Sequence, residues 1–183
     1  FMGESAKIIN PDKKVLIPDP KADCPMAHMA DIEKIKELRK QYDDLAVVCY
    51  INSTAELKKY SDVCVTSANA LNIVRALPNK HIFFVPDENL GKYVASQIPE
   101  KHFIFNDGRC PIHAGLTADT LLAAKKAHPE AQILIHPECT PDTLKLADYI
   151  GSTSGIIRYA TESPSNSFII CTENGVMHAL MKK

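Results

Sequence analysis

Tryptophan is absent from this 183-residue chain, and glycine is scarce, with seven residues. Charge of one sign is lacking too: 22 acidic and 21 basic residues give a formal net charge of −1, which offers no basic footprint for nucleic acid. No segment has the apolar length of a membrane helix or the layout of a signal peptide. With 45% hydrophobic residues, the chain can still build a core. We therefore expect a cytoplasmic protein with small-molecule partners and no nucleic-acid or membrane contacts.

An internal repeat with an offset of 86 residues is the strongest feature of the sequence. Residues 47–62 reappear as residues 133–148, and Cys24 and Cys110 have the same offset, since 110 − 24 = 86. Within the repeat, Thr54 matches Thr140, Lys59 matches Lys145 and Asp62 matches Asp148. Two thiols at equivalent positions of a repeat suggest a metal site on a pseudo-symmetry axis.

A third, partial copy lies at the start of the chain, where residues 9–19 are similar to residues 77–87. This similarity predicts a segment of a three-unit protein. Residues 1–24 would be the end of a truncated first unit, residues 25–110 a second unit, and residues 111–183 an incomplete third unit. The period predicts a further cysteine one repeat after Cys110, beyond Lys183.

Strand and helix patterns alternate along the chain. Short apolar strands are predicted at 46–50, 63–65 and 82–85, and helices at 31–38, 55–60 and 67–77, with Asp31 as a capping residue. Residues 117–170 repeat this order. The alternation indicates parallel βαβ units. The predicted fold class is therefore α/β, with repeated three-layer αβα units around short parallel sheets.

The six cysteines have different surroundings, and without a secretion signal they favour reduced thiols or metal ligands over disulfides. Three lie in apolar runs typical of buried strands: Cys49, Cys64 and Cys171. Cys24 and Cys110 lie in polar loops directly before a proline, where a thiolate can project toward a ligand. Cys139 fits either a loop thiol or a metal ligand.

Polar side chains follow the predicted strands, at the sheet edge where ligands of parallel sheets bind. They are Tyr50 with Asn52, Thr66 with Ser67, His136 with Glu138, and Ser152 with Thr153. Hydroxyls and free N–H groups at helix starts bind carboxylate or phosphate, so an anionic substrate is implied. The plainer reading makes Ser67 and Ser152 simple N-caps and leaves His113, His136 and Glu138 without a role.

The ordered motifs of this chain resemble those of quinolinate synthase over essentially its whole length. The matching segments are 1–8, 24–27, 50–55, 66–69, 86–91, 110–113, 136–139 and 151–154. The resemblance implies three similar αβα units related by pseudo-threefold symmetry, and a [4Fe–4S] cluster held by one cysteine from each unit with the fourth iron open. It also implies condensation of iminoaspartate with dihydroxyacetone phosphate, with loss of phosphate and water, to quinolinate, the precursor of NAD. Iminoaspartate could be transferred from an aspartate-oxidising enzyme.

Carried onto this chain, the resemblance makes Cys24 and Cys110 cluster ligands. The residues lining the site would be Met2, Tyr50, Asn52, Ser67, His113, His136, Glu138, Ser152 and Thr153. Proton transfer during imine condensation and dehydration suits Glu138 and His113, with Tyr50 as a movable donor. The family's amino-terminal unit and third cluster cysteine are absent from the sequence given, so we expect this segment alone to be inactive.

Two other classes of function fit parts of the same pattern. A cluster-free module could use the strand ends to bind small anions. A zinc hydrolase could use His136, Glu138 and Cys139, although this spacing is too tight for the usual helical zinc motif. Metal analysis distinguishes the iron–sulfur synthase, the cluster-free module and the zinc hydrolase.

Overall fold

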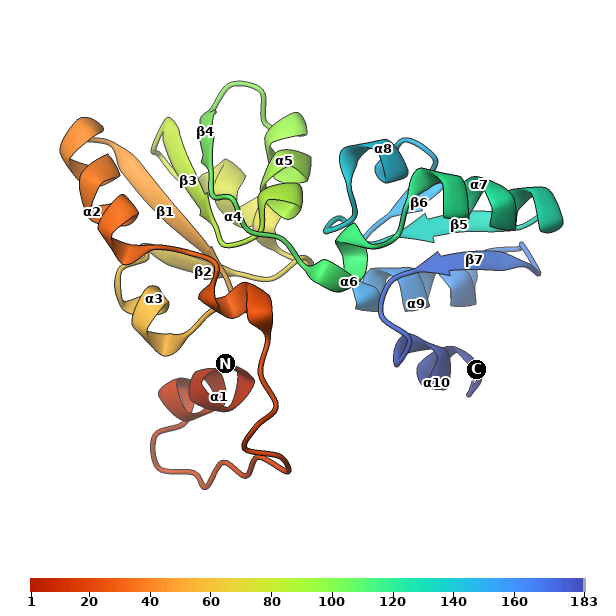
Figure 1. The fold of residues 1–183 in the computed structure, drawn as a ribbon, viewed down its shortest axis with the longest axis horizontal. Coiled ribbons are helices and arrows are strands. Elements are labelled where there is room, and N and C mark those ends of the chain that lie inside the picture. The colour runs from red at the N-terminus through yellow and green to blue at the C-terminus, as the bar shows by residue number, and fades with distance from the viewer. Residues whose placement is uncertain (183) are drawn as a thin grey trace. The chain divides into compact units, whose positions relative to one another are not determined.

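The computed structural model describes residues 1–182, and the chain divides into two compact units, one of residues 1–109 and one that begins at Cys110. Each unit has a short, all-parallel sheet flanked by helices (Figure 1). The predicted α/β class with αβα units is therefore confirmed. No helix among residues 1–182 has both the length and the apolar character needed to cross a membrane.

Unit 1 contains a four-stranded sheet in the order β2-β1-β3-β4. Its strands are β1 (Leu45–Tyr50), β2 (Val63–Val65), β3 (His81–Val85) and β4 (His102–Phe105). All six residues of β1 are buried, because this strand is flanked on both edges and covered on both faces. The strand is apolar throughout for that reason.

Helices cover both faces of this sheet. Strands alternate their side chains between faces, so Val47 and Phe83 pack on one side with Ile35 of α2 (Ile32–Gln41) and Leu57 of α3 (Ala55–Lys59). On the other side, Gly91 of α5 (Glu88–Ser96) packs closely against Phe84. The remaining helical segments of unit 1 are α1 (Met2–Ile9), the 3₁₀ turn η1 (Pro25–His28) and α4 (Ala70–Ala76).

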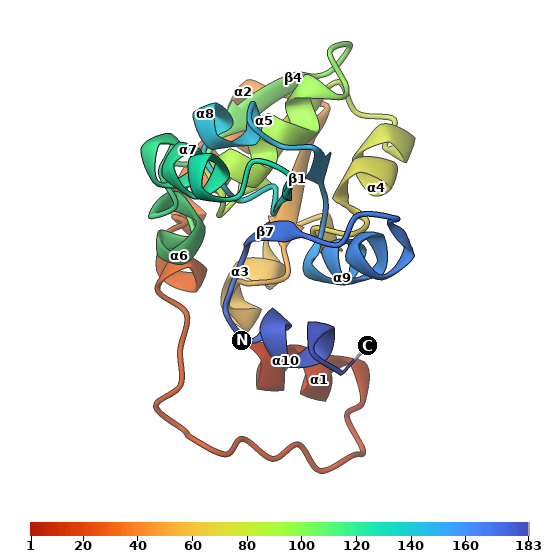
Figure 2. The ribbon, with the colours of Figure 1, turned by 90° about the vertical axis from the view of Figure 1, so that its right-hand side faces the viewer.

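Unit 2 has a three-stranded sheet that corresponds to strands β2, β1 and β3 of unit 1. Its sheet has the order β6-β5-β7, with β5 (Gln132–Ile135), β6 (Tyr149–Ile150) and β7 (Phe168–Cys171). Its helices are α6 (Pro111–Ala114), α7 (Ala118–Ala127), α8 (Pro141–Leu144), α9 (Thr153–Glu162) and α10 (Val176–Leu180). Figure 2 shows α7 and α9 on opposite sides of the sheet.

The repeat seen in the sequence has a structural counterpart at two aspartates. The Asp62 carboxylate accepts a hydrogen bond from the N–H of Val47 at 2.7 Å, and the Asp148 carboxylate accepts one from Ile133 at 2.7 Å. In return, the N–H of each aspartate donates to the carbonyl of the same strand residue. Each copy thus ties its central strand to the start of the next strand in the same way.

Two local expectations were wrong. Cys64 is exposed rather than buried, because β2 is the edge strand of the sheet. The helix predicted at 67–77 spans only Ala70–Ala76. The side chain of Asn69 accepts hydrogen bonds from the N–H and hydroxyl of Thr66. These bonds hold residues 66–69 in a turn, so the helix begins only at Ala70. Ser67 is therefore not an N-cap.

Candidate active site

Two buried polar side chains follow the central strand of unit 2. His136 and Glu138 are 3% and 2% exposed, directly beyond the end of β5. The N–H of His136 donates to the carbonyl of Cys171 at 3.0 Å, which continues the pairing of β5 with β7. The turn then closes by a bond from the N–H of Cys139 to the carbonyl of His136. The strand end therefore holds an imidazole and a carboxylate in fixed places.

The short helix α6 brings a second imidazole and a thiol to the same place. Cys110 is the N-cap of α6 and Pro111 is its first residue, so His113 lies one turn after the thiol. Nδ1 of His113 lies 2.9 Å from Oε2 of Glu138 and 3.2 Å from Sγ of Cys110. The rings of His113 and His136 stack with centroids 4.4 Å apart. Four of the predicted site residues thus meet in unit 2.

The two stacked imidazoles have opposite pKa shifts. Burial lowers the pKa of His113, but its hydrogen bonds with Cys110 and Glu138 outweigh burial and raise the pKa to about 9. For His136, burial dominates and lowers the pKa to about 4, and the nearby charge of His113 adds to that effect. At neutral pH, His113 is therefore an imidazolium and His136 is a neutral imidazole.

The tautomer of His136 follows from its local hydrogen bond. The N–H of Glu138 donates to Nδ1 of His136 at 3.3 Å. Nδ1 is then the acceptor nitrogen, and the ring proton sits on Nε2. His136 can therefore donate a hydrogen bond from Nε2, while His113 can deliver a proton.

Thr172 belongs to this cluster, although it was not among the predicted site residues. Its hydroxyl lies 3.1 Å from Nε2 of His113, and it directly follows the last residue of β7. The same signal that selected His136, a polar residue directly after an apolar strand, could have found it. The prediction considered the strands before His136 and Ser152 and omitted the end of β7.

Ser152 and Thr153 lie at the start of α9, where the prediction placed them. The Ser152 hydroxyl accepts a hydrogen bond from the N–H of Gly155 at 3.2 Å, so Ser152 is an N-cap. Both residues are partly exposed, and the first turn of this ten-residue helix contains no acidic residue. The start of α9 can therefore receive an anion without charge repulsion from its own first turn.

In unit 1, the corresponding strand end carries Tyr50 and Asn52. Tyr50 is 6% exposed, and its carbonyl accepts a hydrogen bond from the Ser53 hydroxyl at 2.8 Å. Asn52 and Ser67 are both partly exposed, and the N–H of Ile51 donates to the carbonyl of Val65. This last bond keeps the ends of β1 and β2 together, and with them the turns that carry Asn52 and Ser67.

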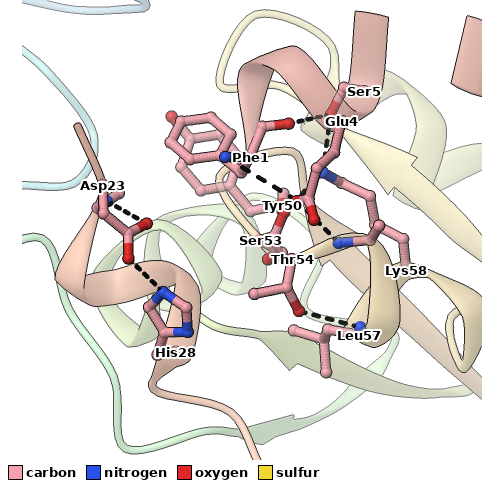
Figure 3. Close-up of polar contacts among 12 residues, drawn as sticks. Phe1, Glu4, Ser5, Asp23, His28, Tyr50, Ser53, Thr54, Leu57 and Lys58 are labelled. Atoms are coloured by element: carbon pink, nitrogen blue, oxygen red, sulfur yellow. Dashed lines mark hydrogen bonds and ion pairs between the residues drawn. The ribbon is translucent and has the colours of Figure 1, made fainter. Parts of the chain in front are cut away.

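Cys24 has the same local setting as Cys110. It is partly exposed and is the N-cap of η1, whose first residue is Pro25. Next to it, Asp23 accepts hydrogen bonds from the N–H of Cys24 and from His28 (Figure 3). These bonds, that of the Cys24 backbone foremost, lower the pKa of the Asp23 carboxyl.

Met2 lies on α1, at the edge of a pocket in unit 1. It is 63% exposed, and with Asp23 it lines a cavity of about 240 Å³. The helix is held against α3: the Glu4 carboxylate accepts from the N–H of Ala55, and Lys58 donates to the Ser5 hydroxyl at 2.8 Å (Figure 3). Met2 therefore lies near the loop that carries Cys24.

Cys110, His113 and Glu138 could together bind a metal ion. One donor atom of each lies within 4.8 Å of the others, and among residues 1–182 no other such group of three is found. Cys139, which the zinc alternative needs, instead packs in the core with Ile135 and Cys171. The zinc site proposed for His136, Glu138 and Cys139 is therefore not formed.

Comparisons with known proteins identify the family of this chain. A family model described as quinolinate synthetase A protein (NadA) matches residues 1–183. The quinolinate synthases of Fusobacterium nucleatum subsp. nucleatum, Sulfurihydrogenibium sp. (strain YO3AOP1) and Methanoregula boonei are 54%, 52% and 48% identical over 183 residues. Each alignment covers 100% of this chain and 61%, 59% and 60% of the relative, so the chain spans about 60% of the length of these relatives. The chain belongs to the quinolinate synthetase A family.

Proposed function

We propose that this chain is part of a quinolinate synthase, which condenses iminoaspartate with dihydroxyacetone phosphate to quinolinate in NAD biosynthesis, with loss of phosphate and water. Family membership and the name of the relatives support the reaction. The structural observation that carries the proposal is the contact of buried His113 with both Glu138 and the Cys110 thiol. This contact supports an acid–base role for His113 and Glu138 next to a proposed cluster ligand.

The proposed cofactor is a [4Fe–4S] cluster with Cys24 and Cys110 as two of its three protein ligands. Both thiols are N-caps of short helical turns and both are partly exposed, and cysteine sulfurs are the ligands that hold iron–sulfur clusters. The donor chemistry therefore fits. The third ligand would be the cysteine expected beyond Lys183. When bound, a cluster with three protein ligands supplies an open, Lewis-acidic iron.

Proton transfer is the proposed role of the unit 2 cluster. The Glu138 carboxylate removes a proton from the condensing substrates, and the His113 imidazolium returns one to a departing oxygen. Thr172 orients His113 by its contact with Nε2. His136, which burial keeps neutral at physiological pH, holds a substrate oxygen through its Nε2 proton, and the Glu138 N–H fixes that tautomer by donating to Nδ1.

The remaining residues are proposed to hold the substrates. Ser152 and Thr153, at the start of α9, suit a carboxylate or a phosphate group. Asn52 and Ser67 offer further hydrogen bonds from unit 1, and Met2 borders the site. Tyr50, buried at the end of β1, is the candidate for a movable proton donor. The substrates are small anions in each case, and iminoaspartate would come from an aspartate-oxidising enzyme.

Replacing Glu138 by Gln in the full-length protein tests the proposed base. The amide of Gln can still accept the hydrogen bond of His113 but cannot remove a proton, so turnover should fall at least ~100-fold. Quinolinate formation and the visible spectrum of the cluster are measured together, and the spectrum should not change. Glu130→Gln, on an exposed loop, is the matched control and should retain full turnover. Retained turnover in Glu138→Gln would remove Glu138 from the role of base.

A further inference from the structure

Two cysteines outside the candidate active site lie side by side in the sheet of unit 1. Cys49 of β1 and Cys64 of β2 are register partners on adjacent parallel strands. Such strands are ~4.8 Å apart. Disulfides join Cα atoms that are ~4.4–6.8 Å apart, so this separation is within reach of a bridge. Because register partners point to the same face of a sheet, the two thiols face each other.

The two thiols differ in access to solvent. Cys49 is fully buried and packs with Leu57 and Val85 in the core. Cys64, on the edge strand, is exposed and lines a cavity of about 420 Å³ together with Lys58 and apolar side chains of α1 and α3. A small reagent can therefore reach the sulfur of Cys64 but not that of Cys49.

The surroundings of the pair favour one thiolate and one thiol. The neighbouring Cys64 thiol lowers the pKa of Cys49 to about 6 against the opposing effect of burial. Ser53, Ser61 and the positive charge of Lys58 act in the same direction. The same interaction raises the pKa of Cys64. The buried sulfur is thus the stronger candidate for the thiolate, and a thiolate is the nucleophile in disulfide exchange.

We propose that Cys49 and Cys64 form a dithiol modification site, which closes to a disulfide on reaction with a low-molecular-weight disulfide and reopens with excess thiol. The site lies outside the set of residues assigned to quinolinate synthesis. Its geometry requires only that the two sulfurs approach across one strand spacing.

The chemistry proceeds in two exchanges with glutathione disulfide. The Cys64 thiol passes its proton to the adjacent Cys49 thiolate and attacks one sulfur of glutathione disulfide; the S–S bond breaks, and one glutathione leaves as a thiolate that takes up this proton from Cys49. The Cys49 thiolate then attacks Sγ of Cys64, and the second glutathione leaves and is protonated by water. The two protein sulfurs lose two electrons in total, and one glutathione disulfide becomes two glutathiones.

Peptide mass spectrometry of the full-length protein tests this proposal. The protein is treated anaerobically with glutathione disulfide, remaining thiols are blocked with N-ethylmaleimide, and the protein is digested with trypsin. Cleavage after Lys40, Lys58, Lys59 and Arg75 separates Cys49, in residues 41–58, from Cys64, in residues 60–75. The expected result is a species that joins these two peptides and disappears after reduction.

Two variants and a control identify the roles of the two thiols. Cys49→Ala should stop at the first exchange and retain glutathione on Cys64, whereas Cys64→Ser, at an exposed position, should neither cross-link nor take up glutathione in this region. Cys171→Ala should cross-link like the parent protein. The proposal is overturned if the parent protein keeps glutathione on Cys64 without forming the linked peptides, or if both thiols remain fully blocked by N-ethylmaleimide.

Discussion

The two stacked imidazoles of unit 2 show how neighbouring side chains of one type acquire different chemistry. His113 contacts a carboxylate and a thiol, whereas His136 accepts a backbone N–H and is more deeply buried. The bonds to Cys110 and Glu138 favour the charged form of His113, and burial favours the neutral form of His136. One is therefore suited to giving a proton and the other to holding an oxygen.

The pKa of His136 predicts a loss of stability in acid. Its pKa is about 4 in the folded protein and ~6.5 in an unfolded chain, so between these values the unfolded state binds more protons. Stability is then fully present above pH ~6.5 and falls as the pH drops toward ~4, by up to about 3 kcal/mol from this group. His136→Asn, whose side-chain oxygen can replace Nδ1 as an acceptor, should reduce this fall.

Thermal unfolding midpoints of the full-length protein and of His136→Asn, measured from neutral to acid pH, check this prediction. The two curves should converge as the pH is lowered. The raised pKa of His113 acts in the opposite range: its contribution is present below pH ~6.5 and is lost as the pH rises through about 9. Parallel curves for the two proteins between neutral and acid pH would contradict the assignment to His136.

At single positions, the sequence predicted much of the candidate site in unit 2. Cys110, His113, His136 and Glu138 lie together, and Ser152 and Thr153 lie at a helix start. The prediction for Cys64 was wrong, because an apolar run does not reveal which strand of a sheet lies at its edge. The pairing of Cys49 with Cys64 was missed for a related reason, since strand register cannot be read from either strand alone.

At the level of elements, the equivalent aspartates Asp62 and Asp148, each just before the second strand of its βαβ unit, make a testable contribution. Asp148→Ala removes the acceptor for the N–H of Ile133 and should lower the free energy of unfolding by about 1–2 kcal/mol. Asp142→Ala is the matched control: Asp142 is 80% exposed and its carboxylate pairs with the exposed Lys145, so no measurable change is expected.

Denaturant unfolding of the two alanine variants and of the parent protein measures this difference. Equal effects of Asp148→Ala and Asp142→Ala would show that the bond to Ile133 has no special role. The comparison applies to unit 1 as well, because Asp62 makes the same bond to Val47. There, Arg39 also contacts the carboxylate at 2.8 Å, so Asp62→Ala should cost at least as much as Asp148→Ala.

The elements themselves were predicted well where two independent signals agreed. The strands expected at 46–50, 63–65 and 82–85 correspond to β1, β2 and β3 within one residue, because apolar composition and the repeat identified the same segments. Strand β4 was not predicted. Its counterpart 86 positions earlier, residues 16–19, contains a proline and forms no strand, so the repeat did not support the short run at 102–105. The start of α4 was predicted three residues too early. The hydrogen bonds between Asn69 and Thr66 that form the preceding turn depend on local turn geometry, which helical periodicity does not describe.

At the scale of the whole molecule, the proposed cluster predicts the metal content of the full-length protein. Anaerobically purified protein should be brown and contain about four irons per chain, with matching sulfide. Cys24→Ala or Cys110→Ala should each bleach the visible absorption, because each would remove one of only three thiolate ligands. Cys171→Ala, in the core of unit 2, should keep the iron.

Iron and sulfide analysis together with the visible spectrum distinguishes the proposed enzyme from a cluster-free anion-binding module. A colourless parent protein that still binds a dicarboxylate, and is unaffected by either substitution, would support a cluster-free anion-binding module. Of the three proposed segments, residues 1–24, 25–110 and 111–183, the first would supply Cys24 and the second Cys110, so loss of either of these two cysteines should have the same result.

The matching sheets β2-β1-β3 and β6-β5-β7 have a further consequence for how the chain diversified. Positions that differ by 86 residues occupy the same place after the central strand, yet Tyr50 corresponds to His136 and Asn52 to Glu138. The aspartates that fix the backbone are the same in both copies. The two copies thus share one backbone frame and differ in the residues just past it, so that the same frame presents a phenol and an amide in one copy and an imidazole and a carboxylate in the other.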